Sequence, residues 1–149
     1  MLSPGDVAPA FRGTDQRGHE VDLEALVEQG PVVLYFYPKD FTQVCTQEAC
    51  LFRDAYADLK DQAAEVVGVS VDADDTHRRF AEKYDIGFPL LSDKSRRISK
   101  DYGVQRLFGL FTKRVTFVID RERRIRGVFH HELSADKHVQ DVRQCLASL

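Results

Sequence analysis

Residues 31–50 read PVVLYFYPKDFTQVCTQEAC, and they place two different hydrophobic patterns next to each other. The first, Pro31–Tyr37, is a continuous apolar run too short for a helix, which predicts a strand buried on both faces. From Cys45 to Lys60, apolar side chains recur at three- and four-residue intervals, which is typical of an amphipathic helix. A second buried strand follows at Val66–Val71. This order predicts two parallel strands joined by a right-handed crossover.

The segments on either side extend this unit. Before it, residues 11–21 read as two short extended pieces around a turn at residues 16–18. After it we expect a helix over residues 76–85, with Asp74 or Asp75 as its cap and Gly87 as its end, and then a short strand at Phe88–Leu91. A second helix should cover Arg96–Tyr102 and stop at Gly103. The chain should close with a hairpin of Val115–Ile119 and Ile125–Phe129, followed by a helix at Ser134–Leu149 with Ser134 as N-cap. The sequence therefore predicts an α/β fold with a central mixed β-sheet and helices on both faces, in three layers.

Length and composition narrow the class of protein. The 149 residues contain no repeat or linker, so we expect a single domain over residues 1–149. The net charge of −3 gives no general attraction to nucleic acid, and no apolar run is long enough to span a membrane. The N-terminus lacks a signal-peptide pattern, and three cysteines do not make a secreted disulfide framework. We therefore expect a cytoplasmic protein in which any role of the cysteines is chemical and not that of structural disulfides.

Cys45 lies where the predicted helix begins. A free cysteine has a pKa near ~8.5 and is mostly protonated at neutral pH, whereas unpaired N–H groups and the helix dipole favour its thiolate. The same donors can stabilise a developing oxyanion. Thr42 offers a hydroxyl three residues upstream, and Pro38 shapes the turn without a donor to satisfy. The alternative is a buried, inert Cys45 with Pro38 and Thr42 as ordinary strand-end and capping residues.

The pattern Pro38-x-x-x-Thr42-x-x-Cys45 resembles the active-site motif of the peroxiredoxins, and YFYPKDFT with CTQEAC is similar to their bacterioferritin-comigratory (PrxQ) branch. The resemblance continues through VVGVSVD, RRFAEKYDIGFPLLSD and RVTFVID. It implies a thioredoxin-like fold and a thiol peroxidase for antioxidant defence that reduces hydrogen peroxide and organic hydroperoxides without a cofactor or metal. It also implies re-reduction by thioredoxin or a similar dithiol protein, and a monomer, since the branch includes many monomers.

The same resemblance assigns roles to individual residues. Cys45 matches the peroxidatic cysteine, which attacks the peroxide and becomes a sulfenic acid. Thr42 would hydrogen-bond the peroxide, and Pro38 would limit solvent access. Arg114, immediately before the strand VTFVID, matches the active-site arginine, whose fixed charge stabilises both the thiolate and the departing oxygen. Glu48 matches a position at which a polar residue orients this arginine.

Cys50 matches the resolving position of the branch, where a thiol condenses with the Cys45 sulfenic acid to form an intramolecular disulfide. If both cysteines lie on one helix, their Cα atoms are about 8 to 9 Å apart. A disulfide needs less than about 7 Å. We therefore expect helix in the reduced protein and local unfolding around residues 43–52 in the oxidised one. The alternative for Cys50 is a buried helix residue.

Two positions depart from the branch, which usually carries Pro and Gly where this chain has Gln43 and Val44. A β-branched valine does not easily adopt the left-handed conformation that glycine permits. We therefore expect the loop before Cys45 to have an atypical geometry.

The remaining cysteine and the histidines are interpreted mainly as structural or surface residues. Cys145 falls on the inner face of the last predicted helix and is read as structural, with a resolving or regulatory role as the alternative. His130, His131 and His138 are read as surface residues, because adjacent histidines on a strand point to opposite faces. Three rival functions stay open: a disulfide oxidoreductase, which normally uses C-x-x-C, a non-catalytic redox sensor, and a metal-binding module.

Overall fold

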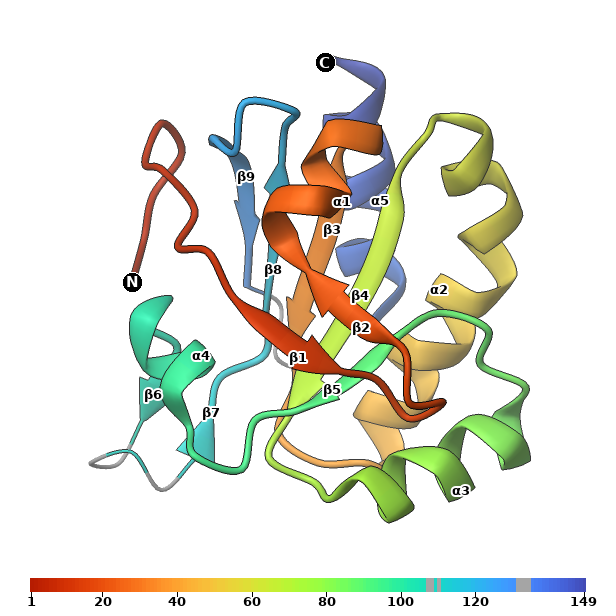
Figure 1. Cartoon of the computed structure of the whole chain (residues 1–149). Helices are drawn as coiled ribbons and strands as arrows, with labels where there is room; N and C mark the ends of the chain where they lie inside the picture. The colour runs from red at the N-terminus through yellow and green to blue at the C-terminus, as the bar shows by residue number, and fades with distance from the viewer. Residues whose placement is uncertain (107–108, 110, 131–134) are drawn as a thin grey trace.

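The computed structural model describes residues 1–106, 109, 111–130 and 135–149, and its centre is a five-stranded sheet (Figure 1). The strand order is β5-β4-β3-β8-β9. These strands are β3 (Val32–Phe36), β4 (Glu65–Ser70), β5 (Leu90–Ser92), β8 (Val115–Ile119) and β9 (Ile125–Phe129). β3, β4 and β5 run parallel, whereas β8 pairs antiparallel with both β3 and β9. The mixed sheet and the crossover from β3 to β4 are as predicted.

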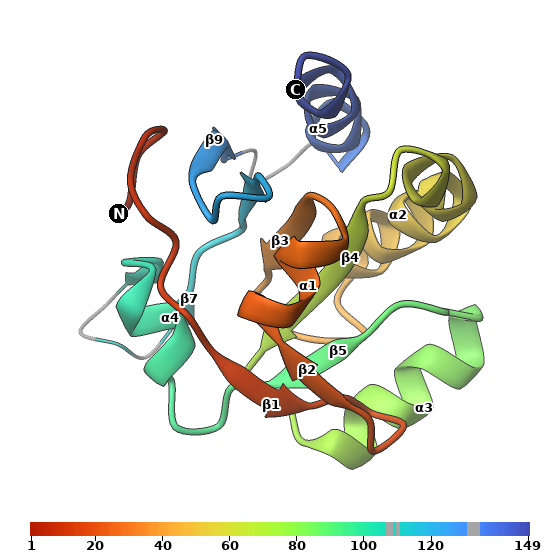
Figure 2. The same cartoon turned by 45° about the horizontal axis from the view of Figure 1, so that its top comes forward.

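Helices cover both faces of this sheet (Figure 2). They are α1 (Leu23–Gln29), α2 (Gln43–Asp61), α3 (Asp74–Tyr84), α4 (Arg97–Asp101) and α5 (Ala135–Ala147). Because β3 is central, its alternating side chains enter two cores. Tyr35 packs with Phe52 of α2 and Val142 of α5, while Leu34 packs in the other core with Val27 of α1. The three predicted layers are therefore present.

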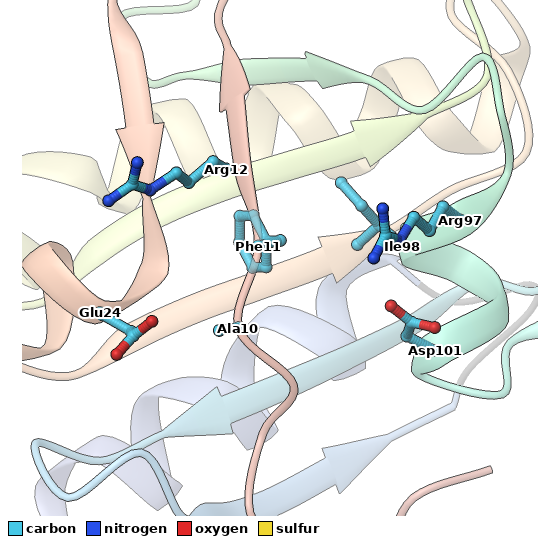
Figure 3. A pocket seen from close by; sticks show the side chains of 7 residues that line it. All are labelled: Ala10, Phe11, Arg12, Glu24, Arg97, Ile98 and Asp101. Carbon is cyan, nitrogen blue, oxygen red and sulfur yellow. The ribbon is translucent and has the colours of Figure 1, made fainter.

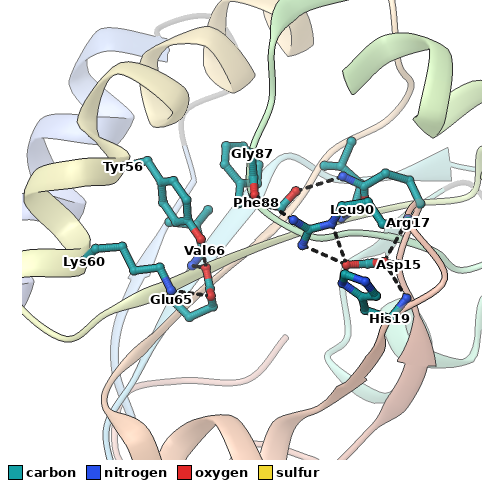
Figure 4. Close-up of polar contacts among 11 residues, drawn as sticks. Asp15, Arg17, His19, Tyr56, Lys60, Glu65, Val66, Gly87, Phe88 and Leu90 are labelled. Atoms are coloured by element: carbon teal, nitrogen blue, oxygen red, sulfur yellow. Dashed lines mark hydrogen bonds and ion pairs between the residues drawn. The ribbon is translucent and has the colours of Figure 1, made fainter. Parts of the chain in front are cut away.

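A small hairpin of β1 (Arg12–Thr14) and β2 (Glu20–Asp22) is fastened to the start of β5 by its turn. The Gln16 amide donates to the Phe88 carbonyl at 3.1 Å, and its oxygen accepts from the Leu90 N–H at 2.8 Å (Figure 4). These contacts join residues far apart in sequence, so the N-terminal segment is part of the fold and not an appendage.

Asp15 closes the hairpin turn. Its buried carboxylate accepts hydrogen bonds from the backbone N–H groups of Arg17 and His19 and pairs with the Arg17 guanidinium at 3.0 Å (Figure 4). Burial alone would raise the pKa of Asp15, but the hydrogen bonds from His19 and Arg17 outweigh it and lower that pKa. The turn is therefore stabilised by the ionised form of Asp15.

On the other side of the sheet, Glu65 at the start of β4 ties that strand to α2. Its carboxylate accepts from the Tyr56 hydroxyl at 2.7 Å and from Lys60 at 2.8 Å (Figure 4). Burial and the neighbouring Glu65 raise the pKa of Tyr56. The C-terminal half of α2 is thus held to the sheet by polar contacts as well as by its apolar face.

Several elements differ from the sequence prediction. α1, β6 (Gln105–Arg106) and β7 (Phe111–Thr112) were not predicted, because each is too short for a readable hydrophobic period. α3 begins at Asp74, so the two aspartates lie in its first turn and Ala73 is the N-cap. It ends at Asp85, which is left-handed, and not at Gly87. β5 is shifted to Leu90–Ser92, and the predicted cap Ser134 lies outside the described residues.

Among the described residues, no helix has the combination of length and apolar character that crossing a bilayer requires.

Candidate active site

Cys45 is the third residue of α2 and is buried, with 1% of its surface exposed. The loop that leads to it leaves the carboxyl end of β3 (Figure 1), the edge of a parallel sheet where ligands bind. The first hydrogen bond of the helix runs from the Thr46 N–H to the Thr42 carbonyl at 2.9 Å. The N–H groups of the turn before Thr46, that of Cys45 included, therefore have no carbonyl within the helix to bond. The positive end of the helix dipole acts on the thiol.

Arg114 connects Cys45 to Glu48. Its Nη2 donates to Cys45 Sγ at 3.1 Å and its Nη1 donates to Glu48 Oε1 at 2.9 Å. Arg114 immediately precedes β8, whereas Cys45 and Glu48 lie one turn apart on α2, and all three side chains are buried. The pairing of β8 with β3 brings the guanidinium to the start of the helix. The resulting triad contains one fixed positive charge between a carboxylate and a thiol.

The electrostatics of the triad keep Arg114 charged. Burial alone would lower the pKa of Arg114, but the adjacent Glu48 and Cys45 outweigh burial and raise that pKa. A guanidinium beside the sulfur can stabilise negative charge that develops there during a reaction. The geometry therefore supports nucleophilic chemistry at Cys45 in a site that excludes most of the solvent.

Thr42 and Pro38 lie in the segment that connects β3 to α2, upstream of Cys45. Thr42 is the N-cap residue of α2, and its exposed hydroxyl donates to the Lys39 carbonyl at 2.7 Å. Pro38 is half-buried and borders a hollow of about 180 Å³, whose other walls include Phe111 and Thr112. Both residues keep part of their surface accessible to solvent, whereas the Cys45 thiol is buried.

Gln43 and Val44 do not form part of a loop, which corrects the expectation of an atypical loop at these positions. They are the first two residues of α2, so the helix begins two positions before Cys45. The left-handed residue is Phe41, with a φ of 66°. Its ring packs against Phe80 of α3 with a centroid separation of 5.2 Å, which holds the turn in place. Val44 therefore needs no left-handed conformation.

Cys50 lies on the same helix as Cys45, and both thiols are free. Five residues of regular helix separate their Cα atoms by about 8 to 9 Å, beyond the reach of a disulfide. The predicted helix in the reduced state is confirmed. A bond between the two sulfurs requires α2 to unwind at its N-terminal end.

Comparison with known proteins agrees with this geometry. The family model described as the AhpC/TSA family matches residues 4–128. The chloroplastic peroxiredoxin Q of Suaeda salsa is 41% identical over 99% of this chain and 69% of its own length. Among solved structures, peroxidoxin BcpB from Mycobacterium tuberculosis is 38% identical, with a TM-score of 0.93 and coverage of 100% of this chain and 99% of that one. This chain belongs to the peroxiredoxins.

A PrxQ structure from Xylella fastidiosa, a cysteine-to-serine variant, is 26% identical with a TM-score of 0.90, covering 99% of this chain and 97% of that one. The peroxiredoxin therefore belongs to the bacterioferritin-comigratory branch and has the thioredoxin-like fold. Its activity is thiol-dependent peroxide reduction. The comparisons do not favour a disulfide oxidoreductase or a non-catalytic sensor.

Sequence reasoning missed a buried network behind the loop of this peroxiredoxin. The Tyr37 hydroxyl donates to Asp40 Oδ1 at 2.5 Å, and His77 Nδ1 lies 2.5 Å from Asp40 Oδ2. His77 Nε2 donates to the Leu91 carbonyl at 3.1 Å, while the Asp40 N–H donates to the Asp72 carboxylate at 2.8 Å. The network fixes the loop to α3 and to β5.

A periodicity in the sequence could have revealed His77, because it lies three residues before Phe80 on the inner face of α3. Ligand atoms of His77, Asp40 and Asp72 lie within 4.8 Å of one another, a spacing that a metal site would also show. Each of these side chains already makes a hydrogen bond in the network. The structure thus accounts for the cluster as a hydrogen-bonded support of the loop.

The reading of the histidines as surface residues is wrong for His138. Its side chain is fully buried, while His130 is exposed and His131 lies outside the described residues. The reason is again periodicity: His138 precedes Val142 by one helical turn and therefore shares the inner face of α5. It contacts the hydroxyl of Thr116 on β8.

Cys145 is half-buried on α5, against β9. A Cβ atom added to Gly127 of β9 would lie 2.8 Å from its sulfur, so the thiol occupies the space that this glycine leaves. Burial raises the pKa of Cys145, although Arg126 opposes the change. The packing against β9 agrees with a structural role for Cys145.

A larger hollow of about 380 Å³ lies outside this site. Figure 3 shows Phe11 at its centre, with Arg12 and Glu24 on one side and Arg97 and Asp101 on the other. Its walls include none of the residues around Cys45. Size alone therefore does not identify the reactive centre of this peroxiredoxin.

Proposed function

We propose that Cys45 is the peroxidatic cysteine of this thiol peroxidase and that Arg114 is its electrostatic partner. The observation that supports these roles is the 3.1 Å contact between Arg114 Nη2 and Cys45 Sγ in a buried first helical turn. Glu48 keeps the guanidinium aligned through its 2.9 Å contact with Nη1. Burial strengthens these electrostatic interactions, because little water is present to screen them.

In the proposed reaction the Cys45 thiolate attacks the terminal oxygen of a hydroperoxide. The O–O bond breaks, an S–O bond forms, and the leaving alkoxide or hydroxide takes up a proton to become alcohol or water. Cys45 is oxidised to the sulfenic acid. Thr42 would hydrogen-bond the peroxide and Pro38 would restrict water, as the match of both residues to the family motif implies; both lie in the connection that leads from β3 to Cys45. Arg114 stabilises the departing oxygen.

Cys50 is the proposed resolving residue. Its thiol condenses with the Cys45 sulfenic acid, which forms the disulfide and releases one water molecule. A dithiol protein of the thioredoxin type then reduces the bond and is itself oxidised to its disulfide. The position of both cysteines on α2 supports this pairing, provided that the helix opens first.

The test is a single oxidation followed by mapping. Reduced protein receives one equivalent of hydrogen peroxide, and the products are identified by mass spectrometry in wild type and in Cys45→Ser, Cys50→Ser and Cys145→Ser. We expect a Cys45–Cys50 disulfide, no oxidation in Cys45→Ser, and accumulation of sulfenic or sulfinic acid in Cys50→Ser. A bond between Cys45 and Cys145 would overturn the choice of Cys50.

We further propose that the chain folds as a single domain, acts as a monomer and resides in the cytoplasm. The absence of a linker motivates the single domain, the many monomers of the branch motivate the assembly, and the odd number of cysteines with no signal-peptide pattern motivates the location. A single cooperative unfolding transition, a monomer mass by sedimentation, and recovery in the cytoplasmic fraction are the expected results. Recovery in another fraction would contradict the location, and a dimer mass would contradict the assembly.

A further inference from the structure

One fully buried ionisable side chain has no role in the proposed reaction, and it lies behind the reactive triad. His138 projects from α5, which packs beside α2 on the same face of the sheet (Figure 2). Its Nε2 lies 3.5 Å from Glu48 Oε2 and contacts the Thr116 hydroxyl. A chain of contacts therefore runs from His138 through Glu48 and Arg114 to Cys45 Sγ.

The chemistry of the partners assigns the proton on His138. A carboxylate oxygen only accepts, so an imidazole lone pair facing Glu48 Oε2 would be repelled in this dry environment. The favourable arrangement has a hydrogen on Nε2, which the carboxylate attracts. Thr116 can then accept from the same N–H or turn its hydroxyl to suit. The two oxygens of Glu48 thus face donors on two different elements, Arg114 beside β8 and His138 on α5.

We propose that His138 is a positioning residue that holds the Glu48 carboxylate in the orientation that aligns Arg114 on Cys45. The inference rests on the proposed function of Cys45. Without the donor, the buried carboxylate turns toward other partners and the guanidinium loses its fixed support. The Cys45 thiolate is then less stabilised, and its reactions with electrophiles slow down.

The same contact also restrains the opening of α2. Glu48 lies between Cys45 and Cys50, inside the segment that must unwind before the disulfide forms. Unwinding separates Glu48 from both Arg114 and His138 and so breaks two contacts between buried polar groups, which opposes the opening of the helix. His138 therefore favours the folded, peroxide-reactive state over the open, resolving state. Loss of the contact should slow the first step and accelerate the second.

The first experiment measures thiolate reactivity without peroxide. In a Cys50→Ser, Cys145→Ser background, Cys45 is the sole cysteine, and its alkylation by iodoacetamide is followed at pH 7. We expect His138→Leu and His138→Asn to react about threefold to tenfold more slowly, because a 3.5 Å electrostatic contact in a buried site contributes less than a full charge-assisted hydrogen bond. His138→Gln, whose amide reaches the position of Nε2, should recover most of the rate. His19→Gln, on an exposed turn, is the matched control and should leave the rate unchanged.

The second experiment uses the three native cysteines and compares sulfinic acid yield per turnover at high hydrogen peroxide. Faster resolution in His138→Leu should lower this yield about threefold, by the same estimate of the lost contact. Circular dichroism identifies variants that do not fold, and His138→Asn then serves in place of His138→Leu. An alkylation rate within twofold of wild type, or a His138→Gln as slow as the leucine variant, would overturn the proposal. Failure of wild type to be oxidised by peroxide would instead reject the proposed function.

Discussion

Replacement of Arg114 by lysine tests the electrostatic account of the site most directly. The guanidinium donates from two nitrogens, to Cys45 Sγ at 3.1 Å and to Glu48 Oε1 at 2.9 Å. A lysine ammonium keeps the charge but cannot hold both partners in this fork geometry. One charge-assisted hydrogen bond is therefore lost, and such bonds contribute about 1.5–3 kcal/mol. Since 1.36 kcal/mol corresponds to tenfold in rate, sulfenic acid formation should slow by about 10- to 150-fold.

The assay is the second-order rate constant for oxidation of Cys45 in a Cys50→Ser background. Because the chain contains no tryptophan, the reaction is followed by rapid acid quench and intact mass, not by tryptophan fluorescence. Arg97→Lys is the control, because Arg97 is exposed and lines the hollow of Figure 3, not the triad. A folded Arg114→Lys variant whose rate stays within about threefold of wild type would refute the reasoning. Such a change in rate is well below the change expected from the loss of one charge-assisted hydrogen bond.

Three further predictions concern opening, loop support and acid stability. Hydrogen exchange of the helical N–H groups of residues 46–52 should be slow in the reduced protein and fast in the disulfide form; equal protection in both would argue against unwinding. His77→Leu removes one of the two side-chain contacts of the buried Asp40, whose other partner is Tyr37, and should lower the free energy of unfolding in urea by about 1–3 kcal/mol, whereas a loss below about 0.5 kcal/mol would contradict the network. Because the pKa of Asp15 is lowered on folding from its ordinary value of 3.8, its contribution to stability is present above that pH and lost as the pH falls through the folded pKa. Wild type should therefore lose more stability than Asp15→Asn below about pH 4, and parallel curves would exclude this contribution.

The main architecture could be predicted because strong periodic signals match the central elements. Pro31–Tyr37 is apolar at every position, and β3 is indeed buried on both faces. α1 could not be predicted, since seven residues give too little pattern, and its start depends on the Asp22 side chain accepting from the Glu24 N–H. The boundary of α2 was misplaced because Gln43 and Val44 carry no capping signal of their own.

The candidate site was predictable to the extent that residue types and family resemblance specify it. Arg114 and Glu48 do meet at Cys45, a contact that local sequence alone does not show, because it depends on the antiparallel pairing of β8 with β3. His77 and His138 were missed for another reason. His138 was predicted to be exposed and His77 was not assigned to the inner face of its helix, although each lies about one helical turn before a buried apolar residue, Val142 and Phe80 respectively.

The anchoring of Phe41 on Phe80 sets limits on the segment that unwinds. Phe41 is fixed on one side of this segment, and Phe52 is fixed on the other by stacking on Tyr35 at 4.8 Å. The residues between them form a loop of about ten residues, and loops of this size close in roughly 10–100 ns. Once the helix has melted, encounter of the two sulfurs is therefore never the slow event. The rate of disulfide formation becomes a property of the few side chains that hold the first turns of α2, so substitutions there can tune it without altering either thiol.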